Sequence, residues 1–183
     1  MTFVVAGATG NTGKVVAEAL LARGKSVRLV VRDAKKVEAL TKQGAEVAVA
    51  DLGDTDALAR ALAGAEGAYL LVPPNMGAPD FRAYQRATIA SITAALTKSP
   101  VKHVVLLSSI GAQHPDKTGP IAALHGAEAS LRGIPGVTAS FLRAGYFIEN
   151  LAGSLGMLDQ GILPSFVPAD QGIDMIATQD IGK

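Results

Sequence analysis

The chain has 183 residues, 49% hydrophobic and 18% charged, so it is long and apolar enough to form a compact domain. Its 17 basic and 16 acidic residues leave a net charge of +1, which gives no electrostatic reason to expect nucleic acid or an acidic membrane as partner. The absence of cysteine excludes disulfides, thiolate metal sites and a cysteine nucleophile. Because the sequence shows neither a signal peptide nor an apolar run of about 20 residues, we expect a soluble cytoplasmic protein.

Short apolar runs alternate along most of the chain with segments in which apolar residues recur at helical spacing. The runs are continuous rather than interleaved with polar residues, which is typical of parallel strands buried on both faces. The predicted strands are Thr2–Ala6, Ser26–Val31, Ala45–Ala50, Gly67–Val72, Val101–Leu107 and Val137–Leu142. The predicted helices are Thr12–Arg23, Ala34–Gln43, Thr55–Ala63, Phe81–Lys98 and Ile121–Arg132. This order predicts an α/β fold, a doubly wound Rossmann-type parallel sheet with helices on both faces.

A turn with very little side chain separates the first predicted strand from the first predicted helix. It reads GATGNTG, with Gly7, Gly10 and Gly13 three residues apart. In this context the first glycine permits a tight turn, the second lets the backbone approach a diphosphate, and the third lets the helix pack near the strand. Free N–H groups and the positive end of the helix dipole would then face the diphosphate.

Three polar residues accompany these glycines in the predicted diphosphate loop. Asn11 and Thr12 can add side-chain hydrogen bonds, and Thr9 completes the loop. The alternative is a plain strand-to-helix turn that happens to be rich in glycine. The strand–turn–helix context favours dinucleotide binding.

The second predicted strand ends in LVVRDAKK, which bears on the choice of dinucleotide. The guanidinium of Arg32 can form a forked contact with a 2′-phosphate, with Lys36 close by, and this favours NADP(H). A carboxylate near the end of this strand would instead hold the ribose 2′-hydroxyl of NAD(H), and Asp33 could be that group. In the third interpretation the cations are solvated and Asp33 is an ordinary helix cap.

The next two strands add candidates for the adenine and nicotinamide ends of the cofactor. Asp51 and Leu52, in DLGD, are predicted to lie beside the adenine, although Asp51 could equally cap its own loop. Val72 and Pro73, in LLVPPN, are predicted to pass the nicotinamide ribose, although two successive prolines could also be just a rigid strand exit.

The fifth strand ends in HVVLLSS, which places Ser108 where ligands bind in sheets of this kind. A hydroxyl there can bind a substrate carbonyl. It can also merely cap the following loop, and both interpretations stay open.

The motifs GATGNTG, VVRDAKKVEAL, DLGD, HVVLLSS and FLRAGYFIEN occur in this order. Together they resemble the NmrA-like branch of the atypical short-chain dehydrogenases/reductases, nearest its NAD(P)H:quinone oxidoreductase-like and azoreductase-like members. The resemblance implies that the glycine loop holds the diphosphate and that the arginine favours NADPH. It also implies that Tyr146, Phe147 and Asn150 line the nicotinamide or substrate side.

The pattern changes after Arg143, where glycines, prolines and short apolar pieces replace long elements. We expect residues 1–150 to form the NAD(P)-binding Rossmann domain and residues 151–183 to begin a small C-terminal substrate lobe. Asp180 resembles a helix cap, yet the sequence stops at Lys183. Chains of the family usually continue further, which implies that this lobe is cut short.

The sequence lacks the Tyr-x-x-x-Lys pair of ordinary short-chain dehydrogenases, because no tyrosine is followed by a lysine four residues later. Many NmrA-like proteins likewise lack the pair and keep a His and a Glu on this helix, as His125 and Glu128 are here. An imidazole can supply a proton near neutral pH, although His125 could also simply pack. The other histidines show no metal-ligand spacing, so we expect no metal site.

These observations predict an NADPH-dependent reductase that passes hydride to a quinone-like small molecule. The residues predicted to act on the substrate are Ser108, His125 and Tyr146. The alternative is a non-catalytic NADP(H)-binding redox sensor that acts through a protein partner, since the missing Tyr/Lys pair permits both. A nucleotide-sugar epimerase or dehydratase is disfavoured because its chemistry depends on that tyrosine. Helix Phe81–Lys98 could pack in a homodimer or in the core of a monomer.

Overall fold

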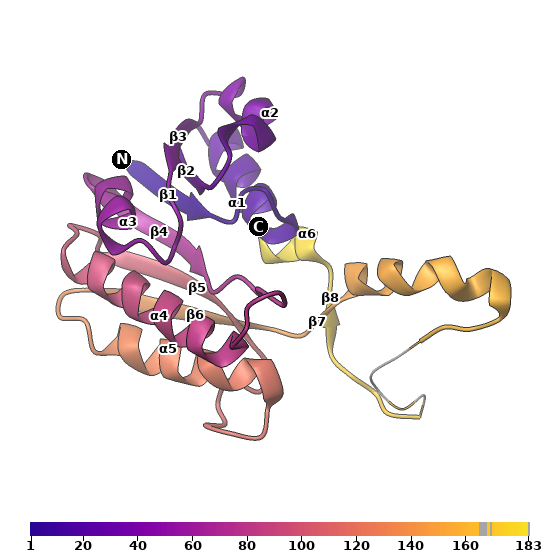
Figure 1. Ribbon diagram of the computed structural model, residues 1–183. Helices are drawn as coiled ribbons and strands as arrows, with labels where there is room; N and C mark the ends of the chain where they lie inside the picture. The colour runs from indigo at the N-terminus through magenta and orange to yellow at the C-terminus, as the bar shows by residue number, and fades with distance from the viewer. Residues whose placement is uncertain (165–167, 169, 183) are drawn as a thin grey trace.

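The computed structural model describes residues 1–164, 168 and 170–182 (Figure 1). Residues 165–167, 169 and 183, which belong to the expected C-terminal lobe, lie outside the described residues. Its main sheet has six parallel strands in the order β3-β2-β1-β4-β5-β6. The strands are β1 Thr2–Ala6, β2 Ser26–Val31, β3 Glu46–Val49, β4 Ala65–Leu71, β5 His103–Ser109 and β6 Thr138–Ala144. This order confirms the doubly wound Rossmann-type sheet.

Helices cover both faces of the sheet, as expected. They are α1 Asn11–Ala22, η1 Ala34–Val37, α2 Glu38–Thr41, α3 Thr55–Leu62, α4 Phe81–Thr97, η2 Gly119–Ile121 and α5 Ala122–Arg132. The core on one face joins the sheet to α3, α4 and α5, through side chains such as Leu62, Leu96 and Leu131. The core on the other face joins it to α1 and α2 through Ala17 and Leu40. None of the described helices has the length and apolarity that crossing a membrane takes.

Aspartate side chains begin three of the helical segments. Asp33 accepts a hydrogen bond from a backbone N–H at the start of η1, Asp54 accepts two at the start of α3, and Asp80 accepts one at the start of α4. Each carboxylate accepts hydrogen bonds from N–H groups that have no partner inside the helix. Its negative charge is also stabilised by the positive end of the helix dipole. Asp33 therefore acts as a helix cap, which was one of the interpretations that the sequence allowed.

Two expectations about helices need correction. The single helix expected over 34–43 is divided into η1 and α2, because the backbone leaves helical geometry at Val37 (φ −123°), whose side chain is buried in the core. Asp180 lies inside the short helix α6 Thr178–Ile181 rather than at its cap. The Oε1 atom of Glu149 instead accepts hydrogen bonds from the backbone N–H and the hydroxyl of Thr178, at 2.8 and 2.7 Å.

After β6 the chain forms a separate two-stranded sheet of β7 Tyr146–Phe147 and β8 Met175–Ile176. Between these strands runs the 3-10 segment η3 Ile148–Gln160, which extends away from the main sheet (Figure 1) and has no buried residue. The chain then returns to α6, which packs beside α1. The last strand of the main sheet thus ends at Ala144, next to the point where the sequence pattern changes.

The start of α1 lies very close to the end of β1. Gly7 has a φ of +70°, a conformation that suits glycine, and turns the chain sharply after the strand. A Cβ atom on Gly13 would lie 2.6 Å from the carbonyl oxygen of Ala6 and closer still to that of Gly7. The helix can therefore pack at this distance only if residue 13 has no side chain.

This contact predicts that Gly13→Ala lowers the free energy of unfolding by about 1–3 kcal/mol, because rigid backbone would have to move. Gly126→Ala is the matched control: Gly126 also lies within a helix, but nothing lies within 4 Å of its added Cβ. We expect the control to raise stability by about 0.5–1 kcal/mol through helix propensity. Urea unfolding measures both values, and equal effects of the two substitutions would contradict the close contact.

Candidate functional site

A cleft of about 560 Å³ opens at the carboxyl ends of β1, β4, β5 and β6. In a sheet of this order, ligands bind at these ends, where the strand order reverses between β1 and β4. Ten residues singled out from the sequence line the cleft: Gly7, Thr9, Gly10, Thr12, Val72, Pro73, Ser108, Tyr146, Phe147 and Asn150. Sequence reasoning missed several of its apolar walls, among them Leu71, Leu107 and Leu124.

A smaller hollow of about 100 Å³ lies on the other side of the glycine turn. Arg32, Asp51 and Leu52 line it, beside the ends of β2 and β3. The two hollows share Gly7, Thr9, Leu71 and Pro73, so one elongated ligand can lie across the turn with an end in each. Asn11, Gly13, Lys36 and His125 line neither hollow.

The glycine turn presents an open backbone surface between the hollows. The N–H of Gly10 donates to the carbonyl of Gly7 at 2.9 Å, and within 4 Å an added Cβ on Gly10 would meet only that oxygen. Gly10 is also the N-cap of α1 and supplies no side chain to cap the helix. The first-turn N–H groups therefore have no side-chain cap and can receive an anionic group.

Arg32 and Asp33, which follow β2, have different surroundings. Arg32 is exposed and lines the small hollow, whereas the Asp33 carboxylate accepts from the N–H of Lys35 at 3.0 Å and is not part of that lining. Lys36 is exposed on η1. Of the two charged residues Arg32 and Asp33, only the cation thus lines the hollow.

Asp51 caps its own loop and also lines the small hollow. Its Oδ1 atom accepts from the N–H of Gly53 at 2.7 Å, which is the loop cap, and the residue also lines the small hollow with Leu52. The loop hydrogen bond holds the carboxylate in place next to the hollow.

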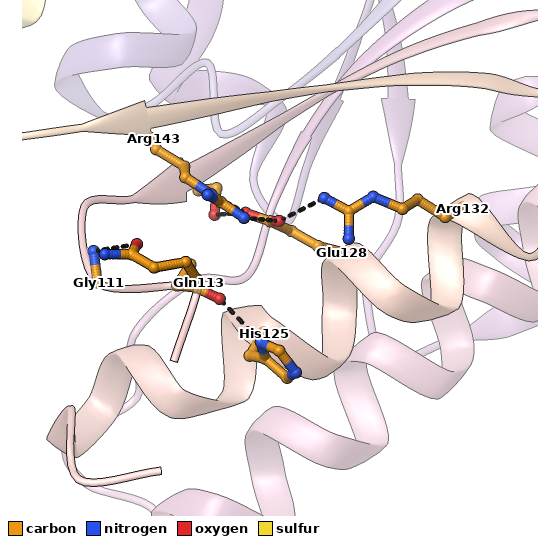
Figure 2. Close-up of polar contacts among 8 residues, drawn as sticks. Gly111, Gln113, His125, Glu128, Arg132 and Arg143 are labelled. Atoms are coloured by element: carbon orange, nitrogen blue, oxygen red, sulfur yellow. Dashed lines mark hydrogen bonds and ion pairs between the residues drawn. The ribbon is translucent and has the colours of Figure 1, made fainter. Parts of the chain in front are cut away.

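Ser108 belongs to a buried polar network that reaches away from the cleft. Its hydroxyl donates to Oε1 of Glu128 at 2.7 Å, and Glu128 is only 1% exposed. Figure 2 shows the Glu128 carboxylate between the guanidinium groups of Arg143 and Arg132. Arg143 donates from Nε to Oε1 at 2.9 Å and from Nη2 to Oε2 at 2.6 Å, and Arg132 donates to Oε2 at 3.0 Å. These contacts, led by the hydrogen bond from Arg143, lower the pKa of the Glu128 carboxyl.

His125 lies one helical turn before Glu128, on the side of the loop that follows β5 (Figure 2). Its Nδ1 atom lies 3.0 Å from the carbonyl oxygen of Ala112, so Nδ1 carries the proton if this contact is a hydrogen bond. The structure therefore brings Ser108 and Tyr146 to the cleft and leaves His125 beside it. Among the described residues, no group of carboxylates and histidines could hold a metal ion.

The sheet order, the glycine turn and the cleft at the strand ends define a dinucleotide-binding α/β protein. Residues 7–150 match the family model described as NAD(P)H-binding, and the chain belongs to that family. This membership confirms the resemblance and the cofactor class inferred from the sequence.

Proteins similar to this chain include a quinone oxidoreductase and a triphenylmethane reductase. The chain is 32% identical over 163 residues to quinone oxidoreductase 2 of Escherichia coli (strain K12), covering 86% of this chain and 54% of that protein. The E. coli NADPH-dependent quinone oxidoreductase in complex with NADPH has a TM-score of 0.69 and 30% identity, over 88% of this chain and 55% of the other. Citrobacter sp. triphenylmethane reductase in complex with NADP(H) has a TM-score of 0.83 over 100% of this chain and 63% of the other, and its 23% identity shows the fold alone. The chain thus spans about half the length of the E. coli relative.

The Glu128 network predicts a specific dependence of stability on pH. The pKa of this carboxyl is lowered in the folded protein from its ordinary value of 4.5, so its stabilising contribution is complete above about pH 4.5. That contribution is lost as the pH falls through the lower folded-state pKa. Glu128→Gln removes it, and we expect a smaller loss of stability between pH 6 and 3 than in the parent. Urea unfolding over this pH range measures the effect, and an equally steep acid limb in the variant would contradict it.

Proposed function

We propose that the protein is an NADPH-dependent reductase that transfers hydride to a quinone-like small molecule. The observation that carries this proposal is the position of the glycine turn between two hollows, one with Arg32 and the other with apolar walls and several hydroxyl-bearing residues. The E. coli relative, named a quinone oxidoreductase, supports the same class of reaction.

The residues present suit a dinucleotide phosphate across the turn. The open surface at Gly10 would take the diphosphate, Asp51 and Leu52 the adenine, and Arg32 the 2′-phosphate. Asp33 is used as a helix cap and is not part of the lining that holds Arg32, so its carboxylate does not compete for the 2′ position. When bound, the reduced nicotinamide would supply the hydride.

The larger cleft suits a flat acceptor. Val72, Leu124 and Phe147 give it apolar walls, while Ser108 and Tyr146 add hydroxyl groups. Quinone reduction by hydride needs a cofactor held against the acceptor and depends less on a positioned acid than alcohol oxidation does. The missing Tyr/Lys pair is therefore compatible with this reaction, and solvent can provide the proton.

Arg32→Ala should weaken NADPH binding about ten- to hundredfold, because one charge-assisted contact contributes about 1.5–3 kcal/mol. NADH has no 2′-phosphate, so its affinity should stay the same. Arg60→Ala, which removes an exposed arginine on α3, is the control and should change neither constant. Fluorescence titration gives both affinities, and equal losses for the two cofactors would contradict a 2′-phosphate contact.

Gly10→Val should abolish NADPH binding, since its side chain would occupy the open surface that the diphosphate needs. Turnover is then tested with the parent protein and a panel of quinones, by following the loss of nicotinamide absorbance. Steady oxidation that disappears in Gly10→Val is the expected result. Tight NADPH binding without turnover on any acceptor would overturn the reductase and favour the redox sensor.

His125→Ala distinguishes the two roles that the sequence left open for this residue. Because the ring lies outside the cleft lining and contacts a backbone carbonyl, we expect less than a tenfold loss of quinone turnover. A loss of about 10²–10⁴ would instead identify His125 as a general acid. Measuring kcat for the variant and the parent at the same NADPH saturation decides between them.

A further inference from the structure

The hydrogen-bond network behind Ser108 determines which hydrogen-bonding role its hydroxyl can take in the cleft. The carboxylate of Glu128 has two oxygens and receives four hydrogen bonds: one from Ser108, two from Arg143 and one from Arg132. Two oxygens offer about four lone-pair sites. The carboxylate is therefore saturated with donors and holds each of them in place.

An ionised carboxylate can only accept hydrogen bonds. The two arginines keep Glu128 charged, so the single hydroxyl hydrogen of Ser108 must point to Glu128 Oε1, 2.7 Å away. Ser108 is 4% exposed and lines the cleft, so only the lone pairs of its oxygen remain for a ligand. This role is opposite to the donation to a substrate carbonyl that the sequence suggested.

The network links three elements of the fold. Ser108 and Arg143 are paired residues of the neighbouring strands β5 and β6, and Glu128 and Arg132 are one turn apart on α5. The guanidinium of Arg132 also lies 4.6 Å above the ring of Phe141. Reversing the Ser108 hydroxyl would leave a buried carboxylate oxygen one donor short, which is costly in a site of low dielectric.

We propose that Glu128 is a positioning residue that holds Ser108 as a hydrogen-bond acceptor toward the cleft. The ligand group that meets Ser108 must then be a donor, either the amide N–H₂ of the nicotinamide carboxamide or a hydroxyl of the reduced acceptor. The inference rests on the proposed function, because it assumes that the cleft takes the nicotinamide end of the cofactor and its acceptor.

The test compares ligands that differ only in the donor. NADPH is compared with its 3-acetylpyridine analogue, which keeps the carbonyl and lacks the N–H₂ group, and a hydroquinone is compared with its quinone. Binding constants are measured by titration calorimetry for the parent, Ser108→Ala and the control Ser140→Ala, which removes an exposed hydroxyl on β6. Thermal unfolding confirms that each variant is folded.

If the carboxamide is the donor, Ser108→Ala weakens NADPH about threefold to tenfold and leaves the analogue unchanged. If the donor is the acceptor's hydroxyl, the same variant weakens the hydroquinone and leaves the quinone and both nucleotides unchanged. Either result supports the proposal and identifies the source of the donor. Unchanged affinity for all four ligands, or equal losses with and without the donor, would overturn it.

Glu128→Gln tests the positioning role itself. An amide N–H₂ can donate to Ser108 and release its hydroxyl hydrogen, so the preference for donor-bearing ligands should fall as it does in Ser108→Ala. In the Ser108→Ala background the same substitution should cause no further change in binding, whereas a purely structural role would affect both backgrounds equally. If Glu128→Gln does not fold, the ligand comparison with Ser108→Ala still decides whether Ser108 acts as a hydrogen-bond acceptor toward the cleft. If the parent protein does not bind NADPH, the proposed function is overturned together with this inference. If the parent binds NADPH and only the ligand comparisons fail, the inference alone is overturned.

Discussion

The close approach of α1 to the end of β1 is the constraint on which the site depends. Because Gly13 has no side chain, the helix begins directly above the carbonyl groups of Ala6 and Gly7. The uncapped first turn of α1 is thereby brought to the carboxyl end of the sheet, next to the gap where the strand order reverses. A longer residue at this position would push the helix outward and separate the two hollows that now meet at the turn.

The opposite side of the cleft is held by charge rather than by close backbone packing. Glu128 joins β5, β6 and α5 through one buried carboxylate, and Arg143 and Arg132 supply the compensating positive charges. Breaking such a network leaves an uncompensated buried charge, at a cost of about 3–5 kcal/mol. The same contacts that stabilise the strand ends also fix the hydroxyl of Ser108, a residue that lines the cleft.

The fold could be predicted from the sequence because local and global signals agree. Continuous apolar runs marked all six strands of the main sheet, within two residues at either end, and the glycine spacing marked the turn. The Glu128 network could not be predicted, since the partners of Glu128 lie 4, 15 and 20 positions from it in sequence and meet only through strand pairing and helix packing. Arg143 lies within the motif FLRAGYFIEN, but a single sequence does not indicate that its partner is Glu128. The division at Val37 was missed because core packing there outweighs helix propensity.

The wall of the cleft formed by Tyr146 and Phe147 depends on residues far along the chain. The N–H of Tyr146 donates to the carbonyl of Asp174 at 2.9 Å, and β7 pairs with β8. Two residues beyond β7, Glu149 holds the first turn of α6, and α6 packs beside α1, the helix of the glycine turn. The aromatic wall and the glycine turn are thus linked through one short chain of contacts. Residues 174–178 therefore contact both the segment that carries Tyr146 and, through α6, the helix that begins at the glycine turn.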